Sequence, residues 1–469
     1  MTCNYNGAME STEAALHAPF PQSRQNVDQP GDSLVERDRF VTWLRAVAPY
    51  IHAFRGKTFV IGVDGEMIAA GMLETLVQDL SLLNAMGMRV VVVHGSRPQV
   101  VEQLRLRGVE DRYVHGLRVT DPVALECAKE AAGEIRLDIE AAFSQGLPNT
   151  PMAHATVRVI SGNFVTARPV GIVAGVDHLH TGVARKIDAQ SIRFALQSGA
   201  VVLVSPLGFS PTGEAFNLSM EDVAAATAIA LDADKLVFVT EVPGVLDADG
   251  KVLGEVSEAD TTRILAEGKL DSDTECYLRQ ALRACEGGVA RVHLIPHQID
   301  GSVLLELFRH DGVGTMVVEE TLEALRAASM DDLGGILAII RPLEEDGTLV
   351  PREHAQLERE IESFSVIEHD GVIFGCASLR IFPDEQTGEM YCLAVSGGAQ
   401  TQGDGERLLR HIEQRARAAG LKRLYVLTTR TMHWFQKRGF RQGTIEDLPE
   451  SRRDSYDRRR SSQVLVKSL

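Results

Sequence analysis

Between residues 58 and 240 the sequence carries five short valine-rich runs separated by helical patterns, and this alternation restricts the fold more than any other feature. The runs are apolar along their whole length, which is typical of strands buried on both faces of a parallel sheet. We therefore predict an α/β sandwich with a mostly parallel sheet. The predicted strands are residues 58–63, 89–94, 156–160, 200–205 and 235–240, and the predicted helices are 67–86, 123–143, 189–197 and 222–231.

The pattern changes after a last strand-like piece at 315–318, and this change divides the chain into two domains. Beyond residue 330 strand-like runs follow one another with helices before and after them, which predicts a smaller α+β domain. We expect a disordered extension at 1–32, a first domain at 33–318 that opens with an amphipathic helix at 34–54, a linker at 319–328 and a second domain at 329–469.

Composition excludes several classes of protein. The 469 residues include 65 acidic and 48 basic side chains, and the net charge of -17 argues against a nucleic-acid partner. No apolar run approaches the roughly 20 residues of a membrane helix. The first 32 residues lack the features of a signal or transit peptide. The six cysteines form no C-x-x-C pair and the histidines share no ligand spacing. We expect a soluble cytoplasmic protein that needs no metal and has no membrane partner.

A glycine-rich loop lies between a predicted strand ending at Val395 and a predicted helix beginning near Glu406. Free N–H groups at a helix start bind pyrophosphate, and glycines allow close approach. The motif Gln400-x-x-Gly403-x-Gly405 resembles the coenzyme A signature of the GCN5-related N-acetyltransferase (GNAT) family. The resemblance implies a GNAT domain that takes acetyl-CoA as co-substrate. The implied coenzyme contacts are Gln400, Thr401, Gln402, Gly403, Asp404 and Gly405, with the side chain of Asp404 pointing away from the phosphates.

The same resemblance implies roles in catalysis for a strand at 389–395. Glu389 would take a proton from the attacking ammonium group, directly or through water, because only a neutral amine attacks a thioester. The backbone N–H groups of Leu393 and Val395 would bind the thioester oxygen as negative charge develops there. Thr428 would help to protonate the departing thiolate.

Five segments of the larger domain resemble the amino acid kinase family, in particular its N-acetylglutamate kinase branch. They are 58–65, 91–99, 116–121, 217–222 and 236–246. Active kinases of that family hold the phosphoryl group with a first-strand lysine and glycine-rich turns. Here Gly62 stands at the lysine position, Asp64 replaces a glycine, and Ser96 and Arg97 replace two more. Phosphoryl transfer depends on positioning and charge neutralisation, so we expect no kinase activity.

A kinase-like domain followed by a GNAT domain resembles the bacterial N-acetylglutamate synthase family. The resemblance implies acetyl transfer from acetyl-CoA to the α-amine of L-glutamate, the first step of arginine biosynthesis. Arg352, Arg460 and Ser462 would bind the substrate's carboxylates, since guanidinium groups bind carboxylates bidentately. A slip of the match by one or two positions would put Arg458 or Arg459 in place of Arg460.

The resemblance also implies feedback regulation by L-arginine, with His293, Glu306 and Gly312 forming the arginine site. Relatives form rings of subunits through the kinase-like domain. The resemblance therefore implies a homo-oligomer, and a hexamer is one of the assemblies that it allows. Three alternatives stay open: a non-catalytic arginine sensor, a residual acetylglutamate kinase, and an acetyltransferase for another amine.

Overall fold

The computed structural model describes residues 32–114, 116–145, 157–309, 312–318, 324–369, 372–396, 404–458, 460 and 462–469. The chain divides into two compact units, one ending at Ala48 and the other running from Pro49 to Leu469. The boundary falls within α1 (Asp32–Phe54), which confirms the helix expected at 34–54. The predicted extension lies outside the described residues except for Asp32, which begins α1. Within the ranges given above, no helix is both long and apolar enough to span a bilayer.

The main sheet of the larger domain has eight strands in the order β14-β16-β15-β13-β1-β2-β10-β5. Every neighbouring pair is parallel except β15 with β16, so the predicted, mostly parallel sheet is confirmed. Its strands are β1 (Thr58–Val63), β2 (Arg89–His94), β5 (Val159–Ser161), β10 (Val201–Val204), β13 (Lys235–Thr240), β14 (Glu255–Ser257), β15 (Arg291–Pro296) and β16 (Thr315–Val318).

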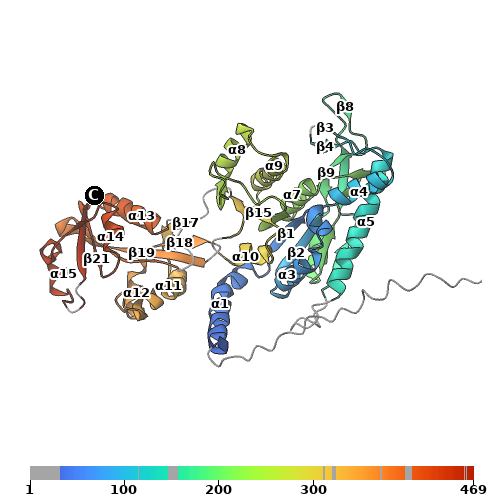
Figure 1. Cartoon of the computed structure of the whole chain (residues 1–469). Helices are drawn as coiled ribbons and strands as arrows, with labels where there is room; N and C mark the ends of the chain where they lie inside the picture. Colours follow the sequence, from blue (N-terminus) through green and yellow to red (C-terminus); the bar gives the residue numbers. More distant parts are fainter. Residues whose placement is uncertain are drawn as a thin grey trace, which may run out of the picture. The chain divides into compact units, whose positions relative to one another are not determined.

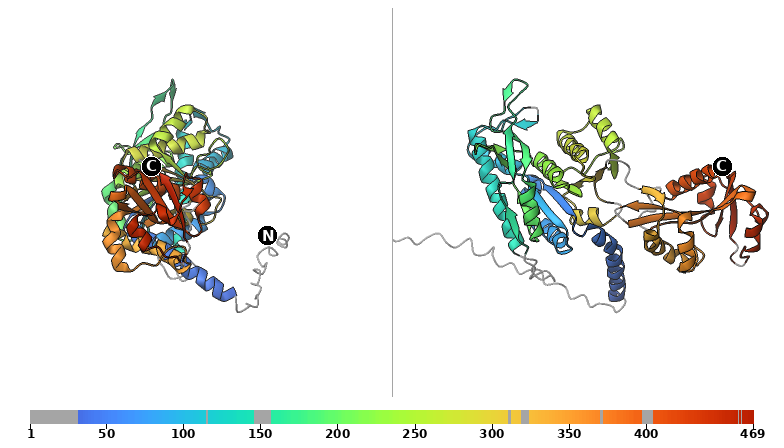
Figure 2. Two further views of the ribbon diagram at one scale, coloured as in Figure 1. Left: turned by 90° about the vertical axis from the view of Figure 1, so that its left-hand side faces the viewer. Right: turned by 180° about the vertical axis from the view of Figure 1, so that it is seen from behind.

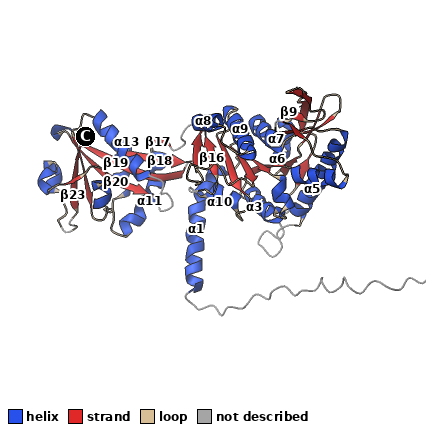
Figure 3. Ribbon diagram, turned by 45° about the horizontal axis from the view of Figure 1, so that its top comes forward, coloured by secondary structure: helices blue, strands red, loops and turns tan. Residues whose placement is uncertain are grey.

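Helices cover both faces of this sheet (Figures 1 and 3). Val60 packs in one core with apolar residues of α6, α7 and α9, whereas its neighbour Phe59 contacts the ring of Phe54. The alternation arises because successive strand side chains point to opposite faces. The helices are α2 (Gly65–Ala69), α3 (Leu73–Ala85), α4 (Arg97–Leu106), α5 (Pro122–Ser144), α6 (Ala189–Gln197), α7 (Met220–Leu231), α8 (Glu258–Glu267), α9 (Ser272–Glu286) and α10 (Ser302–Phe308).

One predicted helix of this domain is wrong in its extent. The segment 67–86 forms two helices, α2 and α3, because Gly71 between them adopts a φ of 75° that a continuing helix excludes. A smaller four-stranded sheet and two hairpins complete the domain (Figure 2). Their strands are β6 (Val165–Pro169), β9 (Gly182–Ile187), β11 (Leu207–Phe209) and β12 (Ala215–Asn217), then β3 (Tyr113–Val114) with β4 (Leu117–Arg118) and β7 (Ile172–Val173) with β8 (Val176–Asp177).

The C-terminal domain is built on a seven-stranded sheet in the order β17-β18-β19-β20-β21-β23-β22, in which only β20 and β21 pair in parallel. This arrangement confirms the predicted α+β domain. Its strands are β17 (Ala324–Ala327), β18 (Phe364–His369), β19 (Val372–Phe382), β20 (Thr387–Val395), β21 (Arg423–Thr428), β22 (Arg441–Gln442) and β23 (Gln463–Ser468).

Helices α11 and α13 pack on opposite faces of this sheet (Figure 1). Gly375 of β19 faces Leu408 of α13, whereas the next residue, Cys376, belongs to the core around α11. The helices are α11 (Leu333–Glu345), α12 (His354–Glu360), α13 (Asp404–Ala418), α14 (Met432–Gln436) and α15 (Glu450–Asp454), with 3-10 turns at Met330–Asp332, Ile361–Ser363, Pro383–Glu385 and Ile445–Asp447.

The linker predicted at 319–328 needs a correction. Residues Ala324–Ala327 form strand β17, which pairs with β18 from Ala324 opposite Glu368 to Ala327 opposite Ser365. The sequence Ala-Leu-Arg-Ala has high helix propensity, and the ladder to β18 overrides it. We place the start of the second domain at or before Ala324; residues 319–323 lie outside the described part.

Two irregularities of β20 shape the centre of the C-terminal domain. Strand β20 pairs with β21 only from Thr387 to Glu389, although both strands continue. The ladder to β19 shifts register between Cys376 and Ser378, and opposite this shift Cys392 has a φ of 51°. An extra residue of this kind bends a strand and redirects its backbone. The last part of β20 therefore diverges from its parallel neighbour just beyond Glu389.

Candidate active site

Glu389 lies on β20 at the point where β20 and β21 separate, and only 3% of its surface is exposed. Its carboxylate is held by two guanidinium groups. Arg452 of α15 places Nη2 3.1 Å from Oε1 and Nε 3.2 Å from each oxygen. Arg380, its partner across the β19–β20 ladder, places Nη1 3.3 Å from Oε2. Burial of a carboxylate is costly unless it is paired, and these contacts supply the pairing.

Further polar groups surround this cluster. Arg380 also donates to Glu360 at 3.0 Å, and Glu360 accepts a hydrogen bond from the Tyr391 hydroxyl at 2.9 Å. Tyr425 of β21 stands beside Glu389 in the parallel ladder. Burial and the negative charge of Glu389 raise the pKa of Tyr425, so its hydroxyl keeps its proton at neutral pH.

A loop at 346–351 collects three arginines from different elements. Arg460 donates from Nη2 to the carbonyls of Gly347 and Thr348 at 3.1 and 2.6 Å. Arg430 contacts the side chain and the carbonyl of Asp346 at 3.2 and 3.0 Å. Arg352 lies over the Tyr391 ring at 5.2 Å, and Arg380 lies over the same ring at 4.7 Å. Arg352 is thus linked to the Glu389 cluster through Tyr391.

The structure also describes four further residues predicted for the catalytic and substrate sites, namely Thr428, Ser462, Leu393 and Val395. The Thr428 hydroxyl bonds the hydroxyl of Thr431 at 2.7 Å and accepts the Thr431 N–H at 3.0 Å, so it stabilises the turn after β21. Ser462 precedes β23 and lines a shallow hollow between β22 and β23, where its carbonyl accepts the hydroxyl of Tyr456. Leu393 and Val395 continue β20 beyond its pairing with β21.

Most of the predicted coenzyme loop, namely Gln400, Thr401, Gln402 and Gly403, lies outside the described residues. Asp404 opens α13 and is 1% exposed, with Oδ1 3.7 Å from Nη1 of Arg407. A Cβ on Gly405 would lie 3.3 Å from the indole of Trp434, so glycine permits this close packing. The helix predicted to begin near Glu406 is present as α13 and begins at Asp404.

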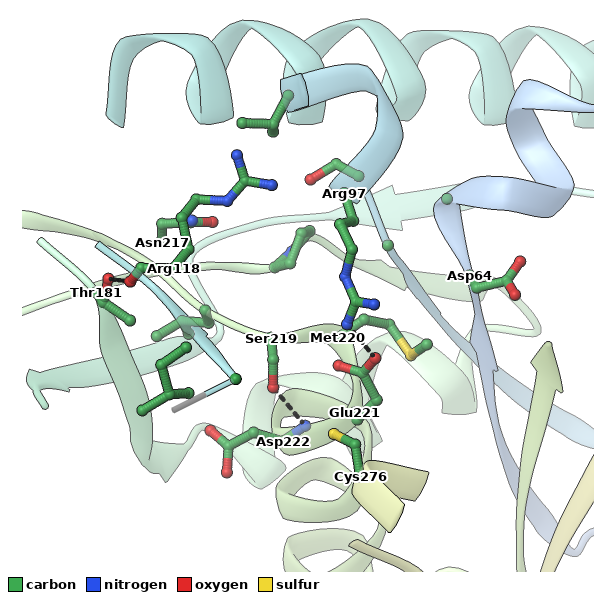
Figure 4. Close-up of a pocket in the computed structure, with 18 of the residues that line it drawn as sticks. Asp64, Arg97, Arg118, Thr181, Asn217, Ser219, Met220, Glu221, Asp222 and Cys276 are labelled. Atoms are coloured by element: carbon green, nitrogen blue, oxygen red, sulfur yellow. Dashed lines mark hydrogen bonds and ion pairs between the residues drawn. The ribbon is translucent and has the colours of Figure 1, made fainter. Parts of the chain in front are cut away.

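The kinase-like domain contains a pocket that is open to solvent (Figure 4). It lies beyond the carboxyl ends of β1 and β2 and beside the N-termini of α4 and α7. Arg118 and Asn217 lie together on one wall, and Arg97 projects toward Glu221. Asp64, Ser96 and Arg97, which differ from the kinase pattern, line this pocket.

Two of the residues that replace the kinase motifs, Asp64 and Arg97, line this pocket and form polar contacts there. Asp64 accepts hydrogen bonds from the N–H groups of Met67 and Glu241, each at 2.8 Å, while burial raises its pKa. Arg97 pairs with Asp273 at 2.9 Å and with Glu221 at 3.4 Å. A Cβ on Gly62 would lie 2.8 Å from Sδ of Met220 and 2.9 Å from Cδ1 of Phe238, so no side chain fits there.

The three residues predicted for an arginine site lie together in the kinase-like domain. His293 donates from Nδ1 to Oε1 of Glu306 at 2.7 Å, and both side chains are buried. Oε2 of Glu306 accepts the Val313 N–H at 2.7 Å, and a Cβ on Gly312 would lie 2.6 Å from that oxygen. Burial opposes the charge of Glu306, but His293 and the backbone donors outweigh it and lower the pKa of the carboxyl.

Comparison with known proteins gives the family. Residues 57–296 match the amino acid kinase family and residues 333–440 the acetyltransferase (GNAT) family. The chain is 64% identical to an amino-acid acetyltransferase of Ralstonia nicotianae, over 92% of this chain and 96% of that protein. It is 48% identical to the amino-acid acetyltransferase of Azotobacter vinelandii, over 92% and 99% of the two chains. The chain belongs to the amino-acid acetyltransferase family.

Solved structures agree with this assignment. N-acetylglutamate synthase from Neisseria gonorrhoeae, complexed with coenzyme A and L-arginine, matches with a TM-score of 0.80 and 40% identity, over 92% of this chain and 99% of that one. Its complex with coenzyme A and N-acetyl-glutamate matches with a TM-score of 0.59 and 41% identity over the same shares. The predicted combination of a kinase-like and a GNAT domain is confirmed.

Sequence reasoning missed several residues of this acetyltransferase's Glu389 cluster, namely Arg380, Arg452, Glu360 and Tyr391, and also missed Arg430 beside the loop at 346–351. A signal for Arg380 was present, since two strands joined by a short turn place it opposite Glu389. Arg452 had only a local Arg-Arg pair to indicate it. The residues described by the structure include no group of three or more His, Cys, Asp or Glu side chains arranged to hold a metal.

Proposed function

We propose that this acetyltransferase moves the acetyl group of acetyl-CoA to the α-amine of L-glutamate. The observation that carries the proposal is the likeness over nearly the whole chain to a synthase solved with coenzyme A and N-acetyl-glutamate. The arginine-rich surroundings of Glu389 support it, because a substrate with two carboxylates needs cationic donors.

Arg352 and Arg460 bind the carboxylates of glutamate in this proposal, with Ser462 beside them. Both guanidinium groups lie near the loop at 346–351 and donate to its carbonyls, Arg352 to Val350 and Arg460 to Thr348. Each retains further N–H groups, since a guanidinium has five donors. A dicarboxylate can therefore add to these contacts without displacing the loop.

Glu389 acts as the general base of the reaction, directly or through water. It takes one proton from the substrate ammonium, and the resulting amine attacks the thioester carbon. The backbone N–H groups of Leu393 and Val395 hold the oxygen as it becomes negative. The C–N bond forms, the C–S bond breaks, and the nitrogen loses a second proton. The thiolate gains a proton, for which Thr428 is the nearest predicted donor, so one proton is released overall.

Coenzyme A sits at the start of α13 in this proposal. Gln400, Thr401, Gln402, Gly403, Asp404 and Gly405 supply the loop and the first helical turn, where N–H groups face an anion. The burial of Asp404 supports a role for its side chain inside the domain rather than toward the phosphates.

L-arginine binds in the kinase-like domain at His293, Glu306 and Gly312 and regulates acetyl transfer. The cluster of a buried carboxylate, an imidazole and backbone N–H groups supports this assignment. Regulation requires that arginine binds two states of the enzyme with different affinity. The kinase-like domain carries no phosphoryl transfer in this proposal, since Met220 and Phe238 fill the space that a lysine at position 62 needs. We also propose that the enzyme is a cytoplasmic homo-oligomer.

The test is a thiol-release assay with acetyl-CoA and a panel of L-glutamate, L-aspartate, L-glutamine and L-ornithine. The expected result is release with glutamate at least about tenfold faster than with the others, because glutamine and ornithine lack the second carboxylate and aspartate is one methylene too short to place both carboxylates. Absence of thiol release with millimolar glutamate would reject the proposal. Equal or faster release with ornithine would replace glutamate by another amine.

A further inference from the structure

We propose that Arg452 is a positioning residue for acetyl transfer, whose guanidinium group orients the Glu389 carboxylate for proton transfer from the substrate ammonium. The inference rests on the proposed function, in which Glu389 takes a proton from that ammonium. The evidence for this inference is the set of contacts around Arg452, a residue to which the GNAT resemblance gave no role.

The contacts of Arg452 hold the Glu389 carboxylate in one orientation. Its Nε lies 3.2 Å from both carboxylate oxygens and its Nη2 lies 3.1 Å from Oε1. Its Nη1 reaches in the other direction, to the hydroxyl of Ser455 at 3.1 Å. The guanidinium plane is thus fixed at both ends, by the end of α15 and by the carboxylate. This fixes the rotation of a carboxylate that would otherwise turn about its last bond.

Arg380, the second cation beside Glu389, is shared with another carboxylate. Its Nη2 donates to Glu360 at 3.0 Å and its Nη1 contacts Glu389 at 3.3 Å. Glu360 therefore keeps the charge of Arg380 paired whatever the state of Glu389. The described contacts of Arg452 are instead with Glu389 and with the neutral Ser455. Arg452 is therefore the cation whose partner changes when Glu389 takes up a proton.

The charged and titratable groups that face Glu389 come from three elements. They are Arg380 on β19, Tyr425 on β21 and Arg452 on α15. Tyr425 stays protonated and neutral, and Arg380 is balanced by Glu360. Without Arg452, the buried Glu389 carboxylate would keep Arg380 as its described cationic partner, and Glu389 shares that partner with Glu360.

A lysine would not replace this arginine. An ammonium group supplies a point charge, whereas a planar guanidinium donates to two oxygens and to Ser455 in a fixed geometry. Arg452→Lys therefore keeps the charge effect and loses the orientation, while Arg452→Gln loses both. The two variants separate electrostatic from geometric contributions, and Arg441→Gln, an exposed position on β22, is the matched control.

The experiment measures thiol release against pH with saturating acetyl-CoA and varied glutamate, for the full-length wild type and these three variants. For Arg452→Gln we expect kcat to fall at least about tenfold with the KM for glutamate unchanged at every pH, because the general base is no longer held in one orientation. Arg452→Lys should also lose kcat without a change in this KM, and Arg441→Gln should match the wild type.

Two results overturn the inference. One is an Arg452→Gln enzyme with the wild-type kcat, and the other is a change confined to the KM for glutamate, which would make Arg452 a substrate ligand. If Arg452→Gln does not fold, Ser455→Ala, which frees one end of the guanidinium, should lower kcat in the same direction, and no change would count against the inference. A wild type that fails to acetylate glutamate rejects the proposed function instead, so the two failures are distinguishable.

Discussion

His293 and Glu306 form a buried pair in the kinase-like domain, with Nδ1 2.7 Å from Oε1. The second oxygen of Glu306 accepts the N–H of Val313, so the carboxylate is aimed at the segment that contains Gly312. We predict that Glu306→Gln weakens L-arginine binding at least about tenfold, because a charged hydrogen-bond partner contributes about 1.5–3 kcal/mol. Isothermal titration with arginine measures the change.

The matched control for this prediction is Glu286→Gln at the exposed end of α9. It should bind arginine with wild-type affinity. Acetyl transfer without arginine should stay within about twofold of wild type in both variants, because Glu306 touches no group of the GNAT domain in the described contacts. Wild-type arginine affinity in Glu306→Gln would remove this residue from the arginine site.

The second prediction concerns the substrate's carboxylates. Arg460→Ala should raise the KM for glutamate by about tenfold to a hundredfold while leaving the KM for acetyl-CoA unchanged, since loss of a charged hydrogen bond costs about 1.5–3 kcal/mol. Arg458→Ala, at an exposed position two residues away, is the control. Initial rates with each substrate varied in turn give both constants. If Arg458→Ala has the larger effect on glutamate, the role belongs to that residue.

Strands β1, β2, β10 and β13 of the larger domain were predictable because each carries a continuous apolar run, for which burial between two layers of helices is the stable solution. Strands β14 and β15 were not predicted. The observed β1, β2 and β13 begin and end where the sequence pattern does. Strand β17 was not predictable, since nothing in Ala-Leu-Arg-Ala indicates a strand apart from its ladder to β18. The segment was therefore predicted as part of a linker.

The candidate site was predictable residue by residue only where a local motif exists. Glu389 was named from a family resemblance, and the helix predicted from Glu406 begins at Asp404. The pairing of Glu389 with Arg452 spans 63 positions and depends on the five-residue helix α15, which has no periodicity to detect. The pairing with Arg380 depends on the register of one hairpin. Long-range pairs of this kind need three-dimensional information.

The third prediction tests the filled space at Gly62. A methyl group there would lie within 3 Å of Met220 and Phe238, so Gly62→Ala should destabilise the kinase-like domain by about 1–3 kcal/mol. Gly133 lies inside α5, where a methyl group would meet no atom of a neighbouring element within 4 Å, so Gly133→Ala should stabilise the domain by about 0.5–1 kcal/mol. Thermal unfolding distinguishes the two signs. Equal effects of the two substitutions would show that the packing around Gly62 yields readily.

The fourth prediction concerns Asp79 on α3. Burial, reinforced by the charge of Asp300, raises the pKa of Asp79 from 3.8 to about 7. The folded state therefore binds a proton that the unfolded state releases, and the stability that this proton provides is lost as the pH rises through about 7. Asp79→Asn removes the titrating group and the repulsion. The free energy of unfolding of this variant should depend less on pH than that of the wild type. Above pH 7 it should be larger than that of the wild type.

Urea unfolding at pH 5 and pH 8 measures this effect. Relative to Asp79→Asn, the wild type should lose about 1–2 kcal/mol between the two values, a figure reduced from the full pKa shift because the side chain is partly exposed and screened by solvent. Asp300→Asn should also reduce the loss of stability between pH 5 and pH 8, but by less than Asp79→Asn does. It removes the repulsion between the two carboxylates and leaves Asp79 buried. The same loss in wild type and Asp79→Asn would assign the pH dependence to another group.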